Sequence, residues 1–587
     1  MALLWMTEPA HYRECPDDGL LSATLFPLLV SAACLYSTRE RWYNSPKTAL
    51  PDNWLIEPPA TLPQRPDGTE PPSPLLSLIY ARQSLVQLST LCSGILLAHV
   101  TASTWREYRC VSQDRLHHRL PHGEARRVWS YIQFGTAVSV ITLALKAAFI
   151  HMDIPLWQEL SFLEIGVISV FHQFALYVMI QLGMVSQIAT GMFMMTFNMT
   201  SAQIWPLTTG FIKTFTLPTP LAIFQIALIP GSFLTGFLLS PLLALSRHIA
   251  QRPIRRLRFP EERKLHRRLL AAGFYLGAAL VVGGMVGMWA RWCLGGRDPW
   301  IWAVFWIVQG RRPWSRPALL TYWGVLGTIS VAGWNRQLAR IRKYRHLSQR
   351  GDQSDGTGTA AGTAPSSMVD RASGAATELL DAADKHVPTL GLNARRKFFH
   401  ALAVVMFVPG IAVDPAFTHL SFSAAFSLFT FAEYVRYFAL YPFGAAVHVF
   451  LSEFLDHKDS GTAILSHFYL LAGCALSLWL EGSSRILEYT GVLSLGVGDA
   501  MASIVGKRVG RRRWSEASGK TIEGSAALVG SVLACALVLR ALGLAETFSI
   551  WRYGVVCCMG ALLEALSVQN DNLTLPLLMW SLGTLWL

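Results

Sequence analysis

The sequence predicts an all-α polytopic membrane protein with about 14 transmembrane helices, within a range of about 12–17, in two halves joined by a flexible cytosolic linker. Hydrophobic residues make up 52% of the 587 residues and charged residues only 15%, whereas soluble domains carry about 25% charged residues. Apolar stretches approaching the roughly 20 residues of a bilayer crossing recur from end to end. The nine cysteines are scattered without a CxxC motif, so neither a disulfide framework nor a zinc site is indicated.

The expected spans follow one another along the whole chain. They lie at about 20–37, 76–100, 128–150, 160–186, 218–245, 268–291, 318–335, 398–415, 419–440, 462–480, 488–506, 523–543, 549–566 and 573–587. Weaker apolar stretches near 188–205, 299–310 and 442–455 predict interfacial or re-entrant segments. The number of crossings between 186 and 318 is therefore left open.

A polar segment divides the chain into regions. Residues 351–377 are rich in Gly, Ala, Ser and Thr and have few bulky apolar side chains, which is typical of a flexible linker. The sequence therefore predicts an N-terminal polytopic membrane region at 1–340, a cytosolic linker at 341–390 and a C-terminal membrane domain at 391–587.

Basic loops orient the spans. The formal net charge is +13, and excess Lys and Arg mark the cytosolic loops of membrane proteins. Residues 247–268 contain nine Lys or Arg against two Glu, and residues 336–350 contain six against no acid. Both loops are expected in the cytosol, which places Arg311, Arg312 and Arg316 on the lumenal side. Nucleic-acid binding is not favoured, because the charge lies between apolar spans.

The same alternation brings five polar clusters of the C-terminal half to one membrane face. They are 395–400, 433–436, 456–459, 499–520 and 564–572. Ionisable groups in or near membrane spans are costly and usually functional. Their convergence predicts a polar site that is open to the cytosol.

The strongest candidate segment is 495–525, which reads LGVGDAMASIVGKRVGRRRWSEASGKTIEGS. Asp499 lies within an apolar span, where an unpaired carboxylate is expensive, so it is a candidate ligand for a divalent cation. Lys520 and Thr521 precede a new apolar helix, and such a helix N-terminus favours anions. Phosphoryl transfer needs both a cation ligand and an anion site, because its catalysis depends mainly on positioning and on neutralising phosphate charge. A Walker A loop would need Gly where Trp514 stands, so a soluble P-loop fold is not indicated.

A packing role is the alternative for part of this segment. Small residues recur every four positions, at Gly498, Ala502, Gly506 and Gly510. Such a stripe also suits helix packing in a membrane, and the basic run 507–513 would then be only a cytosolic anchor. This alternative explains neither Asp499 nor the GKTIEG sequence at 519–524.

Motifs along the C-terminal half resemble those of one enzyme family. They are RKFFH at 396–400, DHKDSG at 456–461, LSHFYLL at 465–471, GDAMAS at 498–503, GKRVG at 506–510, GKTIEGS at 519–525, EAL at 564–566, DNL at 571–573 and Pro576. Together they resemble the dolichol kinases and the wider polyprenol kinase family. The resemblance covers about 390–587, and the N-terminal half matches only in being a long polytopic extension.

The resemblance implies a reaction in which CTP and dolichol give dolichyl phosphate and CDP at the endoplasmic reticulum membrane. The catalytic face would be cytosolic, and the product would carry sugars for protein glycosylation. CTP would be the phosphate donor and a divalent cation, expected to be Mg²⁺, would assist. The expected partners are therefore dolichol, CTP and the bilayer, without nucleic acid.

Residue roles follow from this resemblance as expectations. The residues expected around CTP are Gly496, Gly498, Asp499, Lys507, Gly510, Arg512, Lys520, Thr521, Glu523, Gly524, Arg396 and Lys397. The expected metal ligands are Asp499, Glu564, Asp571 and Asn572. The expected catalytic residues are Asp459, Asp499, Lys520 and His467. Asp459 is the first candidate to take or orient the alcohol proton, and His467 is the second.

Other interpretations stay open at this point. Arg396 and Lys397 could be a positive-inside stop, His400 an interior histidine, and Glu433 and Arg436 a simple i,i+3 ion pair. A cytidylyltransferase that forms a CDP-lipid, or another lipid-alcohol kinase, would use similar parts. A membrane transporter would need only the spans.

Overall fold

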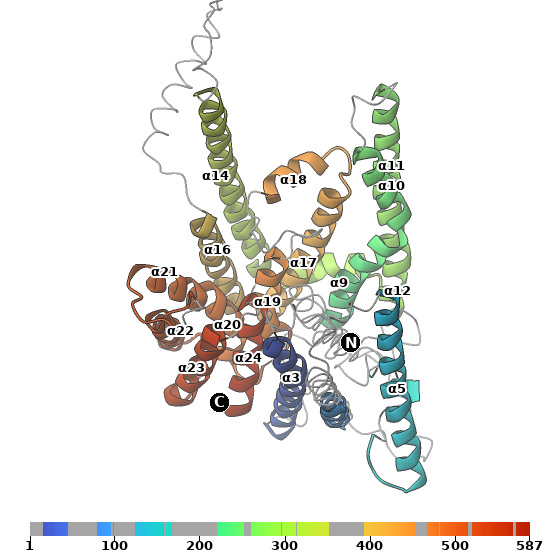
Figure 1. The fold of residues 1–587 in the computed structure, drawn as a ribbon, viewed down its shortest axis with the longest axis vertical. Helices are drawn as coiled ribbons and strands as arrows, with labels where there is room; N and C mark the ends of the chain where they lie inside the picture. The colour runs from blue at the N-terminus through green and yellow to red at the C-terminus, as the bar shows by residue number, and fades with distance from the viewer. Residues whose placement is uncertain are drawn as a thin grey trace, which may run out of the picture.

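The computed structural model of this chain is built from helices (Figure 1). Apart from a few single positions, it describes residues 16–44, 79–95, 124–169, 220–251, 260–351, 392–452, 466–514, 519–566 and 571–587. Within these ranges no strand occurs, and an isolated antiparallel bridge joins Arg513 to Thr521. The predicted all-α fold class is therefore confirmed for the part of the chain that the structure describes.

The helices are bounded as follows. The N-terminal region contains α3 (Pro16–Asn44), α5 (Glu124–His151), α9 (Pro220–Leu238), α10 (Ser240–Gln251), α11 (Pro260–Leu280), the π-helix η4 (Val281–Val286), α12 (Gly287–Cys293), α13 (Pro299–Val308) and α14 (Ser315–Gly351). The C-terminal domain contains α16 (Leu392–Val413), α17 (Pro415–Tyr437), α18 (Gly444–Ser452), α19 (Ser466–Trp479), α20 (Arg485–Val492), the π-helix η6 (Leu493–Asp499), α21 (Ala500–Arg508), α22 (Ile522–Ala541), α23 (Ile550–Leu566) and α24 (Asp571–Trp586).

Several of these helices have the length and composition of membrane spans. Among the described residues, four stretches are long and apolar enough, namely Pro220–Leu238, Lys264–Cys293, Arg396–Val413 and Ile522–Ala541. Shorter apolar helices occur at Val138–His151, Pro299–Val308 and His467–Trp479. The chain is thus a helical protein with membrane-spanning segments, and the total of about 14 crossings stays a prediction. Most of the expected span 160–186 lies outside the described residues.

Helices of the N-terminal region pack directly on the C-terminal domain. In the structure α3 packs on α24, α9 on α17 and α14 on α16, and Figure 1 shows α14 and α16 following one another on the same side of the molecule. α14 continues to Gly351, past the predicted domain boundary at residue 340. The remainder of the predicted linker, 352–390, lies outside the described residues.

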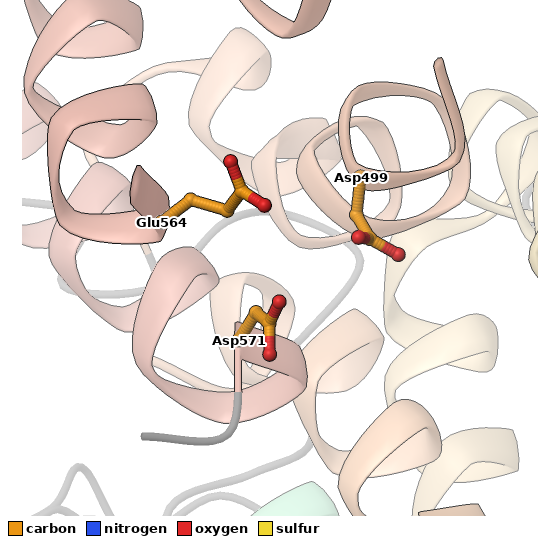
Figure 2. Close-up of side chains that lie close together, drawn as sticks. All are labelled: Asp499, Glu564 and Asp571. Carbon is orange, nitrogen blue, oxygen red and sulfur yellow. The ribbon is translucent and has the colours of Figure 1, made fainter. Parts of the chain in front are cut away.

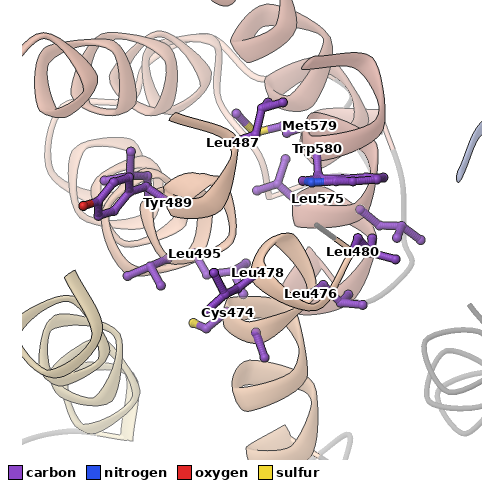
Figure 3. Close-up of a cluster of buried hydrophobic side chains, with 14 of the residues drawn as sticks. Cys474, Leu476, Leu478, Leu480, Leu487, Tyr489, Leu495, Leu575, Met579 and Trp580 are labelled. Atoms are coloured by element: carbon purple, nitrogen blue, oxygen red, sulfur yellow. The ribbon is translucent and has the colours of Figure 1, made fainter. Parts of the chain in front are cut away.

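The largest hydrophobic core lies among α19, α20, α22, α23 and α24 (Figure 3). Twelve of the 16 residues of α24 are buried, because this helix is apolar around its whole circumference and other helices surround it. Trp580 and Met579 of α24, together with Leu487 of α20 and Leu476 of α19, are fully buried in this core. The position of α24 matters for function, because its first turn carries Asp571.

Glycines allow the core helices to approach closely. A Cβ atom at Gly473 of α19 would collide with the backbone carbonyl of Asn572 in α24, and one at Gly491 of α20 would come within 2.5 Å of the Gly473 carbonyl. Small residues at helix contacts bring backbones together in this way in membrane proteins. The start of α24 is therefore held against α19 by backbone contact.

Candidate active site

Three carboxylates from separate helices converge at one end of this core (Figure 2). Asp499 ends η6, Glu564 lies near the end of α23, and Asp571 begins α24. One oxygen of each lies within 4.8 Å of the others. Three carboxylates this close repel one another unless cations neutralise them. The arrangement therefore needs positive charge, either from the protein or from a bound cation.

Lys520 supplies part of that charge. Its Nζ lies 2.5 Å from Oε1 of Glu564 and 2.9 Å from Oδ2 of Asp571. Burial by itself would lower the pKa of Lys520, but the carboxylates of Asp571 and Glu564 outweigh burial and raise the pKa above its ordinary value. Lys520 is therefore positively charged at neutral pH, and one-third of its side chain is exposed.

α16 supplies two further contacts to the cluster. Lys397 Nζ lies 2.7 Å from Oδ2 of Asp499 and donates a second hydrogen bond to the Asp499 backbone carbonyl at 3.2 Å. His400 Nδ1 lies 3.3 Å from the same Oδ2. The spacing of Lys397 and His400, three residues apart, places both side chains on one face of α16. Asp499 is therefore held between η6 and α16.

The π-helix η6 shapes this contact. His400 Nδ1 lies 2.8 Å from the backbone carbonyl of Leu495 in η6. Because a carbonyl can only accept a hydrogen bond, Nδ1 must carry the proton there. Gly496 lets the backbone of η6 approach α16, since a Cβ atom would meet the His400 carbonyl and collide with Val404. Single π-turns inside α-helices occur frequently at functional sites.

The segment between α21 and α22 folds back as a narrow hairpin. Ile522 donates a backbone hydrogen bond to the Arg512 carbonyl at 2.9 Å, and Trp514 donates one to the Lys520 carbonyl at 3.2 Å. The Thr521 hydroxyl caps α22 by accepting from the Gly524 amide at 3.2 Å, which satisfies an otherwise orphan donor at the helix start. This hairpin carries Lys520 toward the carboxylates.

The glycines of the candidate nucleotide segment contact neighbouring helices. A Cβ atom at Gly498 would meet Leu528 and Val532 of α22, and one at Gly524 would meet the Ala502 carbonyl of α21. Gly506 and Gly510 both adjoin the Thr521 side chain. The small-residue stripe thus brings α21 close to α22, as the packing alternative expected. The basic side chains beside it are exposed, namely Lys507, Arg508, Arg511, Arg512 and Arg513.

The remaining expected site residues have different surroundings. Asn572 is buried next to Asp571, with its backbone carbonyl against Gly473. Arg396 is exposed at the start of α16, and Glu523 accepts hydrogen bonds from the Arg512 amide at 3.2 and 3.3 Å. His467 lies beside the rings of Phe399 and Phe429 at 6.4 and 6.3 Å between centroids. Asp459 lies outside the described residues.

One contact of His400 was not predicted from the sequence. His400 is buried and its Nδ1 is bonded to the Leu495 carbonyl, as expected of a satisfied interior histidine. Its contact with the Asp499 carboxylate was not expected. Its position one helical turn after Lys397 was the available signal. Lys397, expected either near CTP or as a positive-inside stop, forms an ion pair with Asp499 that was not expected. Glu433 and Arg436 pair with each other on α17, as the simpler alternative expected.

The carboxylate cluster has the donor chemistry of a divalent-cation site. Oxygen atoms of carboxylates are the ligands that Mg²⁺ uses, usually one or two together with water and phosphate oxygens. Asp499, Glu564 and Asp571 offer such oxygens within 4.8 Å of one another. The residues present therefore fit a cation, and the partly exposed Lys520 side chain beside them suits an anion that accompanies it.

Comparison with known proteins agrees with the motifs. Residues 382–481 match the family model for dolichol kinase. This region of the chain is similar to dolichol kinases. The chain is 43% identical over 197 residues to the dolichol kinase sec59 of Schizosaccharomyces pombe. It is 40% identical over 194 residues to the dolichol kinase EVAN of Arabidopsis thaliana, and 30% identical over 320 residues to the dolichol kinase of Mus musculus.

These similarities cover part of each protein. The aligned segments span 39% of the Schizosaccharomyces pombe dolichol kinase, 34% of the Arabidopsis thaliana one and 51% of the mouse one. They span 32% of this chain in the first two cases and 52% in the third. No solved structure matches the chain. The resemblance stated from the C-terminal motifs is confirmed.

Proposed function

We propose that this chain is a dolichol kinase that transfers the γ-phosphate of CTP to the terminal hydroxyl of dolichol and releases CDP. One observation carries the proposal: the Asp499, Glu564 and Asp571 carboxylates meet beside the ammonium group of Lys520. Phosphoryl transfer depends mainly on positioning and on neutralising phosphate charge. Similarity of the same domain to dolichol kinases supports dolichol as the acceptor.

The carboxylates are the proposed cation ligands, with Asn572 as a further candidate. A bound Mg²⁺ would supply charge neutralisation for the phosphates of CTP. Lys520 is the ammonium best suited to contact the transferred phosphate, because one-third of its side chain is exposed. Lys397 pairs with Asp499 and only 15% of its side chain is exposed, so its proposed role is to orient that carboxylate.

The rest of the nucleotide would lie over exposed basic side chains that come from the end of α21, the segment after it and the start of α16. Lys507 and Arg512 are exposed there, and Arg396 is exposed at the start of α16. Guanidinium and ammonium groups bind phosphate oxygens through charge-assisted hydrogen bonds. These three side chains are the proposed contacts to the outer phosphates or the cytidine end of CTP, on the cytosolic face of the endoplasmic reticulum membrane.

The acceptor hydroxyl needs a base. In the proposed reaction the dolichol oxygen attacks the γ-phosphorus, its proton passes to a protein base, and the bond between the γ-phosphorus and the bridging oxygen of CDP breaks. Asp459 is the first candidate for the base and His467 the second. His467 lies beside Phe399, one residue before His400 on α16, which supports its place near the cluster.

The test is phosphoryl transfer by the purified full-length protein. CTP labelled in the γ-phosphate should pass its label to dolichol, whereas CTP labelled in the α-phosphate should not. Asp499→Asn and Lys520→Met should abolish most of the transfer, because each removes a charge from the cluster. Lys264→Gln, which removes an exposed cation on α11, should leave transfer unchanged.

Each alternative predicts a different product. Incorporation of the α-phosphate with cytidine into lipid would indicate a cytidylyltransferase. Label transfer to a different lipid alcohol in preference to dolichol would indicate another lipid-alcohol kinase. If the wild-type protein transfers no label, or if both cluster variants transfer label at the wild-type rate, the proposed function is wrong.

A further inference from the structure

α14 of the N-terminal region lies antiparallel to α16 and contacts it between Phe398 and Asp414. At one end of the pair, Arg316 Nε lies 2.7 Å from Oδ2 of Asp414, directly after α16. At the other end, Trp334 stacks on Phe399 with 6.0 Å between ring centroids. α14 precedes the segment 382–481 that matches the dolichol kinase model. The contact between α14 and α16 is therefore made by the N-terminal region, whose role the sequence left open.

The middle of this contact compensates for a proline. Pro409 lies inside α16, and proline has no N–H to donate to the carbonyl four residues earlier. That carbonyl belongs to Val405, and the Tyr322 hydroxyl of α14 donates to it at 2.7 Å. In a membrane helix a carbonyl freed by proline needs another donor because lipid offers none, and a neighbouring helix is one source of such a donor. Tyr322 is such a donor.

A second donor and a notch lie beside the first. The indole Nε1 of Trp323 donates to the carbonyl of Met406 at 2.8 Å. Gly410 makes room for this indole, since a Cβ atom at Gly410 would lie 2.8 Å from Cζ2 of Trp323. Pro409 thus removes one hydrogen-bond donor from α16, and Gly410 leaves space on its surface. Tyr322 supplies the missing donor, and Trp323 occupies the space.

α16 carries this contact to the candidate active site. Trp334 adjoins Phe398 and Phe399, with ring centroids 5.3 and 6.0 Å away. Lys397 and His400 flank these two rings on the same helix and contact Asp499. The direction in which α16 continues from its proline therefore decides whether both side chains reach Asp499, since sharp helix bends occur at proline.

We propose that α14 is a positioning strut for the candidate active site, and that Tyr322 and Trp323 are positioning residues. They bind the carbonyls at the proline of α16 and so hold Lys397 and His400 against Asp499. The inference rests on the proposed function only in naming the reaction that the site performs. It assigns to the N-terminal region the role of holding the cation site in shape.

The test is a double-mutant cycle between Tyr322 and Pro409 in the full-length protein. Tyr322→Phe removes one hydroxyl and should weaken Mn²⁺ binding, measured by electron paramagnetic resonance, by about fivefold, the value of one neutral hydrogen bond. The same variant should raise the Mg²⁺ concentration needed for half-maximal transfer and leave the KM for dolichol unchanged. Pro409→Ala restores a backbone donor for Val405, so Tyr322→Phe should have little effect in that background.

Matched controls separate positioning from general damage. Tyr275→Phe makes the same substitution on α11, where the side chain is exposed, and should leave Mn²⁺ binding unchanged. The proposed role of α14 would be overturned if Tyr322→Phe weakened Mn²⁺ binding equally with and without Pro409→Ala. It would also be overturned if Tyr322→Phe bound Mn²⁺ as tightly as the wild-type protein. Because Mn²⁺ binding needs neither CTP nor dolichol, a wild-type protein that binds Mn²⁺ but transfers no phosphate would overturn the proposed function and leave the strut testable.

Discussion

Lys397 and Asp499 are 102 residues apart in the sequence and form an ion pair with 2.7 Å between Nζ and Oδ2. Both side chains are largely shielded, at 15% and 14% exposure. A carboxylate in such surroundings is costly unless a cation accompanies it. The pair therefore links two helices of the C-terminal domain at the point where the other two carboxylates arrive.

Loss of the Lys397 ammonium should disturb Asp499. We expect Lys397→Gln to lower kcat/KM for phosphate transfer by about 10- to 100-fold, because a hydrogen bond to a charged group contributes about 1.5–3 kcal/mol. Steady-state kinetics of the purified protein measure this. Lys264→Gln removes an exposed cation on α11 and serves as the control. Equal kinetics in the two variants would contradict the role given to Lys397.

Removal of the cation should stop the reaction. A chelator is expected to abolish transfer, and excess Mg²⁺ should restore it. Asp571→Asn removes one carboxylate of the cluster, and should raise the half-activating Mg²⁺ concentration by at least the roughly 10- to 100-fold loss typical of a metal ligand's outer partners. A titration of activity against Mg²⁺ measures the shift. Full activity in the presence of chelator would refute a cation site here.

α19 and α24 pack too closely at Gly473 to leave room for a side chain there. Gly473→Ala places a Cβ atom onto the Asn572 carbonyl, and we expect a loss of about 1–3 kcal/mol or more in the free energy of unfolding from overpacking. Activity should fall with it, because Asp571 begins the displaced helix. Denaturant unfolding in detergent measures the change.

The control for this substitution is Gly530→Ala in α22. A Cβ atom built at Gly530 would meet no atom of another described part of the chain within 4 Å, and alanine favours a helix over glycine by about 0.5–1 kcal/mol. Gly530→Ala should therefore leave stability unchanged or raise it. If both alanine variants unfold alike, the close backbone contact at Gly473 is not what holds α24.

The ion pair between Arg316 and Asp414 is buried, at 3% and 1% exposure. Arg316 also lies over the Trp306 ring at 3.8 Å, and Asp414 caps α17 by accepting from the Phe417 amide at 2.9 Å. We expect Arg316→Met to lower the free energy of unfolding by about 3–5 kcal/mol, because it leaves a buried carboxylate without its cation. Thermal or denaturant unfolding measures this.

The double variant is the informative comparison. Asp414→Asn keeps an oxygen that can cap α17 and removes the charge. Arg316→Met combined with Asp414→Asn should therefore cost less than Arg316→Met alone. Strictly additive losses would show that the two side chains do not stabilise each other.

The sequence indicated several of these residues before their partners were visible. Asp499 was a candidate because a carboxylate inside an apolar segment is costly unless it is paired or binds a metal. Lys520 was a candidate because it precedes a new helix. The motif resemblance added Glu564 and Asp571. The structure brings these four side chains together, although Asp459 lies outside its described residues.

Other features had no signal along the chain. Arg316 was expected in an awkward position on the lumenal side, and the structure buries it against Asp414, 98 residues away. Pro409 was visible in the sequence, but the donor that compensates for it comes from Tyr322, which lies 83 residues before Val405, whose carbonyl accepts its hydrogen bond. The two residues of each pair lie on different helices and are not related by helical spacing, so the periodicity of the sequence could not predict either pair.

The sequence by itself determined the all-α fold class and the positions of ionisable groups within apolar segments, because both depend on composition and local periodicity. The tertiary structure alone decided which cation meets which carboxylate. Lys520 reaches Glu564 across 44 residues and Lys397 reaches Asp499 across 102. Such pairings depend on how closely the helices pack. At Gly473 that closeness is set by contact with the Asn572 backbone, and at Gly496 by contact with the Val404 side chain and the His400 carbonyl, which no local pattern encodes.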